Sequence, residues 1–360
     1  MPFDADLLLD GPRGRRLCLE YVRACADDTK AGRDASTALF WAAHLASEAA
    51  DRGTLITFGD GAPPEPPPAG PREAVAALRS IPLPAPTEER LRQALRASVD
   101  RAMYWQRPDG EDLLAAHPEV RDALRSAAEL IAGAPAAQWW TTPMAIDDQW
   151  AVPWEGAGRA PDDLAASLTE WYRRTIEDEE HAARERPSDP RANWSGMWWS
   201  IPPHGLVRTT RSLGGHGPAR LWFEEDSLGG DSADAVPVEG YPARVIEIAG
   251  PEDWAGLCRR HPLDVSAARR HDWFRVTGRA GAWVIPDWRS VAAEADAVHL
   301  TVLGYLTTAT RPIGLDDERA TVLAGWNPDE TFWLRGTLPR PARGERWERH
   351  QDGWRPAPPV

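Results

Sequence analysis

Lysine is almost absent from this chain of 360 residues, because Lys30 is the only one and the other 40 of its 41 basic residues are arginine. A Schiff base or a Walker-type lysine would have to rely on Lys30, and no motif surrounds it. GC-rich coding, which favours arginine, alanine, glycine and proline codons, accounts for the bias. Any anion-binding site must therefore use arginine, hydroxyl or backbone N–H groups.

Cysteine and long apolar runs are also scarce. Three cysteines cannot form a disulfide framework, and none belongs to a C-x-x-C pair. No stretch approaches the roughly 18 apolar residues of a membrane span. The sequence begins with acidic residues where a signal peptide would be basic. We therefore expect a cytoplasmic protein without membrane association.

The net charge of −14 argues against a general affinity for nucleic acid. The partner that we expect is an unknown protein or a small-molecule acceptor.

Common catalytic motifs are missing as well. The sequence has no G-x-S-x-G, H-E-x-x-H, Walker A, G-x-G-x-x-G or EF-hand pattern. No two of its nine histidines lie four residues apart. We expect no metal, although His204, His216 and His299 could converge in space to bind one.

Tryptophan, in contrast, is abundant, with 19 residues, of which twelve fall between residues 191 and 360. Most are expected in the core, since each buries a large apolar area and needs one partner for its N–H group. Some could form a stacking wall for a planar base or a sugar.

The pattern of the chain predicts an α+β fold, with a mainly helical N-terminal portion followed by a mixed, mostly antiparallel split-sheet domain. Proline-rich residues 62–71 indicate a linker, because each ring fixes φ and removes a donor. The expected segments are a helical segment (1–61), the linker (62–71), a helical domain (72–190), an α+β domain (191–335) and a loose tail (336–360).

Periodicity and end signals predict individual elements. The predicted helices of the first part are 17–26, 35–50, 87–105, 118–132 and 162–186, with a strand at 54–58. In the second part, helices are expected to begin at Pro251 and Pro286. The predicted strands there are 206–209, 219–223, 244–248, 282–285, 298–306, 321–324 and 331–334.

Arg208 lies in an apolar strand and needs a charged partner, because an unpaired buried charge is costly. The partner is either an internal acid such as Glu224 or Glu225, or a phosphate bound bidentately by the guanidinium. His299 lies in another apolar strand. It is either a core histidine with one hydrogen-bond partner or an acid/base, since imidazole exchanges protons near neutral pH. Its carboxylate partner as an acid/base would come from residues 224–226.

Three stretches between residues 205 and 334 resemble ADP-ribosyltransferase-like domains. The first is the basic, hydroxyl-rich strand 206–212. The second is strand 244–248 with the helix starts at 251–254 and 286–288 and the strand 296–300. The third is 325–334, which is similar to a late strand that offers an acid. The whole chain also resembles uncharacterised proteins of GC-rich bacteria, which implies no activity.

This resemblance implies an NAD-dependent transferase of the ADP-ribosyltransferase type, or an NAD glycohydrolase, with NAD as substrate. The basic residue that holds the diphosphate and nicotinamide ribose would be Arg208 or His204. Trp326 would be among the aromatic rings that stack on the nicotinamide. The hydroxyl groups implied to assist are those of Thr209, Thr210 and Ser212.

The same resemblance implies a catalytic carboxylate, which is Glu330 or Asp329. It would hydrogen-bond the ribose hydroxyl and stabilise the oxocarbenium character that develops as nicotinamide leaves. Two alternatives remain open. The missing catalytic motifs, the linker and the acidic composition favour a non-catalytic cytoplasmic binding or interaction protein. The other alternative is an enzyme of another class that uses His299 as acid/base.

Overall fold

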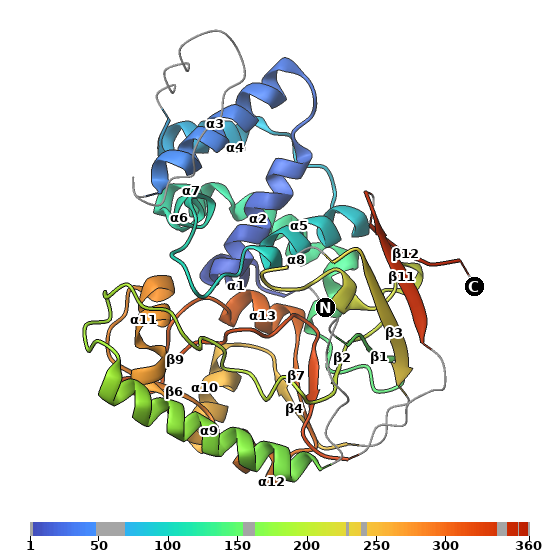
Figure 1. Ribbon diagram of the computed structural model, residues 1–360. Helices are drawn as coiled ribbons and strands as arrows, with labels where there is room; N and C mark the ends of the chain where they lie inside the picture. The colour runs from blue at the N-terminus through green and yellow to red at the C-terminus, as the bar shows by residue number, and fades with distance from the viewer. Residues whose placement is uncertain are drawn as a thin grey trace. The chain divides into compact units, whose positions relative to one another are not determined.

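The computed structural model describes residues 3–47, 69–153, 163–227, 230–238, 243–336, 344–351 and 353–358. The chain has an α+β fold, as the sequence predicted (Figure 1). It divides into two compact units: residues 1–98 with 108–138, and residues 99–107 with 139–360. The expected strand 54–58 and the linker up to residue 68 lie outside the described residues.

The first unit is helical. Helix α3 packs on α4 and α6, while α2 packs on α1, α6 and α8. Residue Arg13 on α2 donates to the Ser98 carbonyl and pairs with Asp112 of α6, so a buried ion pair joins these helices. The helices are α1 (Ala5–Asp10), α2 (Pro12–Cys25), α3 (Lys30–Ala46), α4 (Pro71–Ser80), α5 (Glu88–Asp100, which continues into the second unit), α6 (Gly110–Ala116), α7 (Pro118–Ala123) and α8 (Arg125–Gly133).

The described residues of the second unit form three four-stranded sheets. Their strand orders are β1-β3-β11-β12, β2-β10-β7-β4 and β5-β6-β9-β8. The strands are β1 (Gln149–Ala151), β2 (Arg208–Thr209), β3 (Ser232–Val238), β4 (Val245–Ile248), β5 (Pro262–Asp264), β6 (Ala282–Pro286), β7 (Ala297–Leu300), β8 (Ile313–Gly314), β9 (Arg319–Thr321), β10 (Thr331–Trp333), β11 (Glu345–His350) and β12 (Gly353–Pro356). The helices are α9 (Leu164–Glu185), α10 (Pro251–Arg260), α11 (Ser266–Thr277), α12 (Trp288–Glu294) and α13 (Val302–Thr308).

The sheet β2-β10-β7-β4 carries the candidate residues, so its register matters. Strands β4 and β7 are parallel, and β10 is antiparallel to both β7 and β2. The pairing aligns Glu247, His299, Thr331 and Thr209 in one row across the sheet. The adjacent row contains Ile246, Val298, Phe332 and Arg208. Neighbouring residues of a strand point to opposite faces, so the two rows do too.

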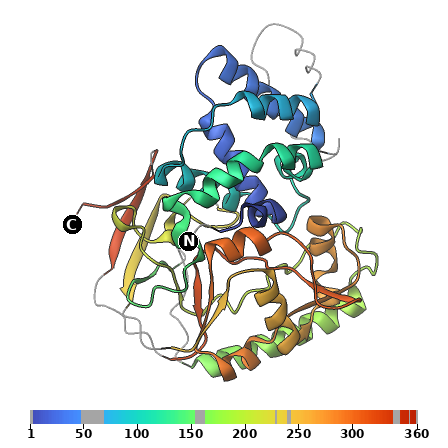
Figure 2. The ribbon, with the colours of Figure 1, turned by 180° about the vertical axis from the view of Figure 1, so that it is seen from behind.

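Helix α9 lies along α11 and α12, and the front and back views agree (Figures 1 and 2). Side chains of α9 and α11 form hydrogen bonds with backbone groups of the other helix. The carboxylate of Glu179 on α9 accepts from the N–H groups of Ala267 and Ala268 in the first turn of α11. Arg270 of α11 donates to the Ala182 carbonyl near the end of α9. Unpaired groups at helix ends are thus satisfied across the contact.

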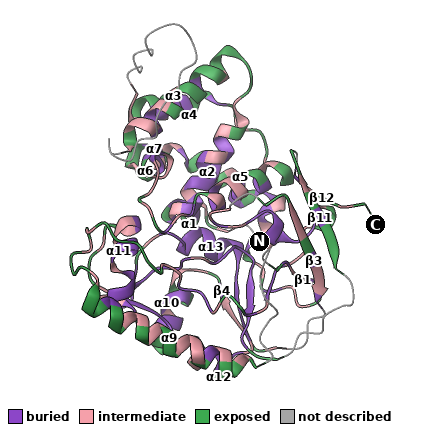
Figure 3. Cartoon of the chain, in the orientation of Figure 1, coloured by how far each residue is buried: buried purple, intermediate pink, exposed green. Residues whose placement is uncertain are grey.

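Tryptophan fills the core of the second unit, as expected for most of these residues. Trp254, Trp288 and Trp326 have ring centroids 5.7 to 6.3 Å apart, and Phe332 of β10 lies 4.9 Å from Trp326. All four side chains are fully buried. Burial differs between the helices of this unit, as Figure 3 shows. Helix α13 is buried, whereas much of α9 is exposed.

Two predicted strands are partly or wholly helical. Residues 219–221 form a 3₁₀ helix rather than the strand expected over 219–223. The strand expected over 298–306 ends at Leu300, and α13 follows. Thr301 causes this change, because its hydroxyl accepts from Gly304 N and caps the helix. A Cβ at Gly304 would lie 2.2 Å from the Ile248 carbonyl oxygen, so glycine allows α13 to lie against β4.

The C-terminal residues also differ from expectation. Residues 336–360 were expected to form a loose tail, but β11 pairs with β3 and β12 pairs with β11. Trp347 on β11 is buried and packs close to Gly217. The expected boundary at residue 190 follows α9, but α9 packs on α11 within the same compact unit.

Candidate functional site

Glu330 immediately precedes β10, and its side chain is fully buried. Arg220 forms an ion pair with its Oε1 atom, and Arg208 Nη1 lies 3.6 Å from the same atom. The Asn327 amide donates to it over 3.4 Å. Glu330 is therefore the partner that Arg208 requires, while Glu224 pairs with Arg220 at 3.3 Å. Two guanidinium groups and an amide enclose this carboxylate.

The electrostatics of this network reflect its burial. Burial, together with the charge of Arg220, lowers the pKa of Arg208 to about 10. Burial also raises the pKa of the Glu224 carboxyl. In both cases burial disfavours the charged form, so these side chains depend on the opposite charges beside them.

Asp329 and His299 form a second buried group beside the first. Asp329 has a left-handed backbone, with φ of 60°, and its carboxylate accepts from Arg211 N at 2.9 Å and from Arg211 Nε at 2.6 Å. His299 Nε2 lies 3.4 Å from Asp329 Oδ1, and its Nδ1 lies 2.6 Å from Glu247 Oε2. Burial disfavours the imidazolium, but these two carboxylates outweigh it and raise the pKa of His299.

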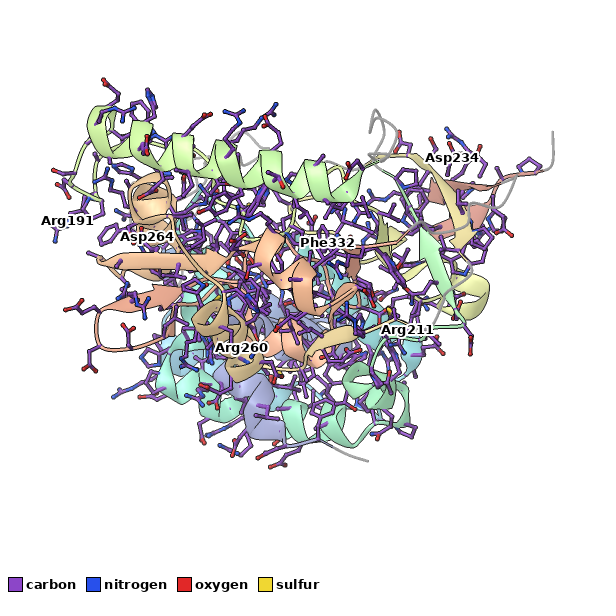
Figure 4. All side chains as sticks on the ribbon, turned by 90° about the horizontal axis from the view of Figure 1, so that it is seen from below. Arg191, Arg211, Asp234, Arg260, Asp264 and Phe332 are labelled. Carbon is purple, nitrogen blue, oxygen red and sulfur yellow. The ribbon has the colours of Figure 1, made fainter. Side chains whose placement is uncertain are left out.

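The residues expected to hold the NAD diphosphate do not lie on one face of the sheet. Arg208 packs over the Phe332 ring at 5.4 Å, whereas Thr209 lies in the other row and accepts from Trp333 Nε1 at 2.8 Å. The hydroxyl of Thr210 accepts from Arg220 N at 3.3 Å. Ser212 follows β2, and its hydroxyl accepts from Gly214 N at 3.0 Å. Figure 4 labels Phe332 and Arg211, which mark the strand β10 and the segment after β2.

Trp326 is also fully buried. Its Nε1 donates to the Glu330 carbonyl at 2.9 Å, and its ring belongs to the core cluster with Trp254 and Trp288. This tryptophan therefore stabilises the segment that carries Glu330.

A pocket of about 610 Å³ lies between α9 and the segment 197–204. We call it the α9 pocket. One face of the helix forms its first wall, because the lining residues of α9 recur at intervals of three and four. The lining consists of Ser167, Glu170, Trp171, Arg174, Thr175 and Asp178 of α9, with Arg186, Met197, Trp199, Ile201, Pro202, Pro203, His204 and Arg269.

His204 connects the α9 pocket with the buried network. His204 is exposed to solvent. Its ring packs edge-on against the Trp199 ring, and the two ring centroids lie 4.3 Å apart. Partial burial of the ring and the nearby charges of Arg208 and Arg220, opposed by Glu330, lower the pKa of His204 to about 4. The alternative basic residues His204 and Arg208 are therefore neighbours, but only His204 lines the pocket.

Most lining residues of the α9 pocket were not candidates in the sequence. The long charged helix 162–186 was predicted, but a charged helix face is usually solvent-exposed. Arg269 lies in α11, where apolar residues show little helical periodicity, so nothing marked it as buried. The signal available was Trp171, a tryptophan between Glu170 and Tyr172 on an otherwise charged helix.

No group of three or more His, Cys, Asp or Glu residues that could hold a metal occurs in the described part of the chain. Within the same residues, no helix has the length and apolar character needed to cross a membrane.

Comparison of this chain with protein-family models, with curated proteins and with solved structures found no match.

Proposed function

We propose that this protein is a non-catalytic binding protein that holds a small organic molecule in the α9 pocket. The observation that carries the proposal is the pocket itself, which combines apolar walls with a few convergent polar groups. This composition and a volume of about 610 Å³ are typical of ligand sites. The expected catalytic side chains, in contrast, are enclosed: Glu330 is 0%, His299 1% and Asp329 2% exposed.

The proposal assigns each group of residues a role. The buried network of Arg208, Arg220 and Glu330 lies behind His204 and stabilises that side of the pocket. His204 offers the ligand a polar group, and Trp199 offers it an aromatic ring. We place this binding in the cytoplasm, as expected from the few, unpaired cysteines.

The NAD-dependent transferase or glycohydrolase is the second candidate. The proximity of His204, which lines the pocket, to Arg208 and Glu330 favours it. In this alternative the ligand is NAD, and Glu330 must become accessible when NAD binds. Release of nicotinamide from NAD by the purified chain is its direct test.

The binding role is tested by filling the pocket. In Thr175→Trp, an indole projects from the middle of the α9 wall, whereas Ala183→Trp places the same group at an exposed position of α9 outside the lining. Each protein is incubated with the small-molecule fraction of a bacterial extract, washed, and analysed for retained compounds by mass spectrometry. We expect wild type and Ala183→Trp to retain a compound that Thr175→Trp does not. Equal retention by all three proteins, or retention by none, would contradict the proposal.

A further inference from the structure

Arg269 is the most unusual residue of the α9 pocket. It comes from α11 and is only 5% exposed, yet it lines the pocket. Its Nε donates to the Trp199 carbonyl at 3.3 Å. Its buried Nη1 atom makes no hydrogen bond within the described residues, and its nearest carboxylate oxygen, Asp178 Oδ2, lies 3.8 Å away.

The carboxylates that line the pocket are already engaged. Asp178 Oδ1 accepts from Arg186 Nη2 at 2.6 Å, and Glu170 accepts from Arg174 Nε at 2.6 Å. Glu170 also binds Arg173, which is not part of the lining. Three arginines and two carboxylates thus line the pocket, which leaves one positive charge in excess.

Burial supports the same conclusion for Arg269. Burial lowers the pKa of Arg269 to about 10, although the charges of Asp178, Glu179 and Asp272 act in the opposite direction. A buried guanidinium of this kind is stabilised by an anion, which it binds through paired N–H groups. The pocket therefore offers an anion the partner that the protein does not fully supply.

The remaining walls are aromatic and apolar. Trp171 belongs to α9, and Trp199 belongs to the facing segment together with Ile201 and Pro202. The Trp199 ring is held by Trp198, 4.8 Å away, and by His204, 4.3 Å away. Fixed tryptophan rings favour a flat ligand, because offset or edge-on ring contacts stabilise aromatic pairs beyond simple burial.

We propose that the α9 pocket binds an aromatic anion, a planar ring that contacts Trp171 and Trp199 and bears a carboxylate or phosphate group paired with Arg269. This inference rests on the proposed binding function and specifies its ligand class. His204 contributes a neutral imidazole near pH 7, so it hydrogen-bonds the ligand without adding charge.

The test uses the full-length chain and four probes, with binding measured by calorimetry and tryptophan quenching. AMP carries a ring and a phosphate, and benzoate carries a ring and a carboxylate. Adenosine carries only the ring, and inorganic phosphate only the charge. We expect AMP, benzoate or both to bind at least tenfold more tightly than adenosine and inorganic phosphate, and the preferred one identifies the anionic group.

Variants locate the binding. Arg269→Gln should weaken binding of the preferred probe at least tenfold, and Trp171→Ala should weaken it severalfold. Arg184→Gln and Trp105→Ala alter exposed residues outside the lining and should leave the affinity unchanged. Should Arg269→Gln fail to fold, Arg174→Glu reverses a charge of the lining at a largely exposed side chain and should also weaken anion binding.

Adenosine binding as tightly as AMP, with Arg269→Gln and Arg174→Glu unchanged, would overturn the aromatic-anion inference. Failure of all four probes would overturn it as well. In either case retention of a compound that Thr175→Trp abolishes would still support the binding function, so the two proposals fail separately.

Discussion

The buried network before β10 and the α9 pocket use the same residue types in different ways. In the network, Arg208 and Arg220 converge on Glu330, and Arg211 and His299 converge on Asp329. In the pocket, Arg186 and Arg269 share Asp178, and one N–H group of Arg269 makes no hydrogen bond among the described residues. Balanced charge stabilises a closed structure, whereas unbalanced charge beside a cavity leaves a place for a ligand.

Glu330→Gln is expected to have the largest effect. Arg208 and Arg220 would then remain buried without their shared carboxylate, and breaking a buried ion pair from one side costs about 3–5 kcal/mol. Urea unfolding at pH 7 measures the loss in the free energy of unfolding. A stable Glu330→Gln protein that loses nicotinamide release from NAD would instead assign Glu330 to catalysis and break the comparison.

Trp326→Phe is expected to cause the next largest loss in the free energy of unfolding. It leaves a small cavity and removes the donor to the buried Glu330 carbonyl, which costs about 1–3 kcal/mol. The matched variant Trp171→Phe changes a half-buried ring of the pocket and should cost less than about 1 kcal/mol. Thermal unfolding of both proteins sharpens the contrast, and equal losses would contradict it.

The two histidines should respond to pH in opposite directions. The raised pKa of His299 contributes stability that is present below about pH 6.5 and is lost as the pH rises through its folded-state value. The pKa of His204, lowered to about 4, contributes stability that is present above about pH 6.5 and is lost as the pH falls towards 4. His299→Gln should flatten the alkaline side of the stability profile, and His204→Asn the acidic side.

Urea unfolding of these variants between pH 4 and 9 measures both effects. Identical profiles for wild type and His299→Gln above pH 6.5 would show that the imidazolium is not stabilised by Glu247 and Asp329.

Arg269→Met is expected to have the smallest effect on stability, under about 1 kcal/mol, because a poorly compensated buried charge is replaced by a shorter, unbranched apolar chain. Asp178 keeps Arg186 as its partner. Chemical unfolding compares this variant with Arg184→Gln, an exposed substitution on α9. A loss as large as that of Glu330→Gln would place Arg269 in the structural core and remove the distinction between the two regions.

The sequence predicted those parts of the fold that depend on local patterns. Alternation in 244–248 predicted β4, and the proline and acids at 251–253 predicted the start of α10. Helix α12 begins at Trp288, two residues later than expected, because Pro286 ends β6 and the Asp287 side chain caps the helix by accepting from Arg289 N and Ser290 N. The apolar run after His299 predicted a strand, because apolar residues alone do not separate a buried strand from a buried helix. The cap at Thr301 decided the outcome.

The candidate site was predictable only in part. An arginine in an apolar strand correctly indicated a charged partner for Arg208, but its identity as Glu330 depends on the pairing of β2 with β10. The α9 pocket depends on contacts between residues far apart in the sequence, such as Trp199 and Arg269, which are 70 positions apart. Periodicity carries no information about contacts of this kind.

The hydrogen bonds between α9 and α11 form an interface between the two helices, and the α9 pocket is built on this interface. Glu179 covers the amides of Ala267 and Ala268, and the next residue along α11 is Arg269. A molecule that contacts both Arg269 of α11 and the lining residues of α9 would therefore slow the opening of the interface between the two helices. Hydrogen exchange at these two amides thus reports occupancy of the pocket, even when the ligand itself is silent to every optical probe.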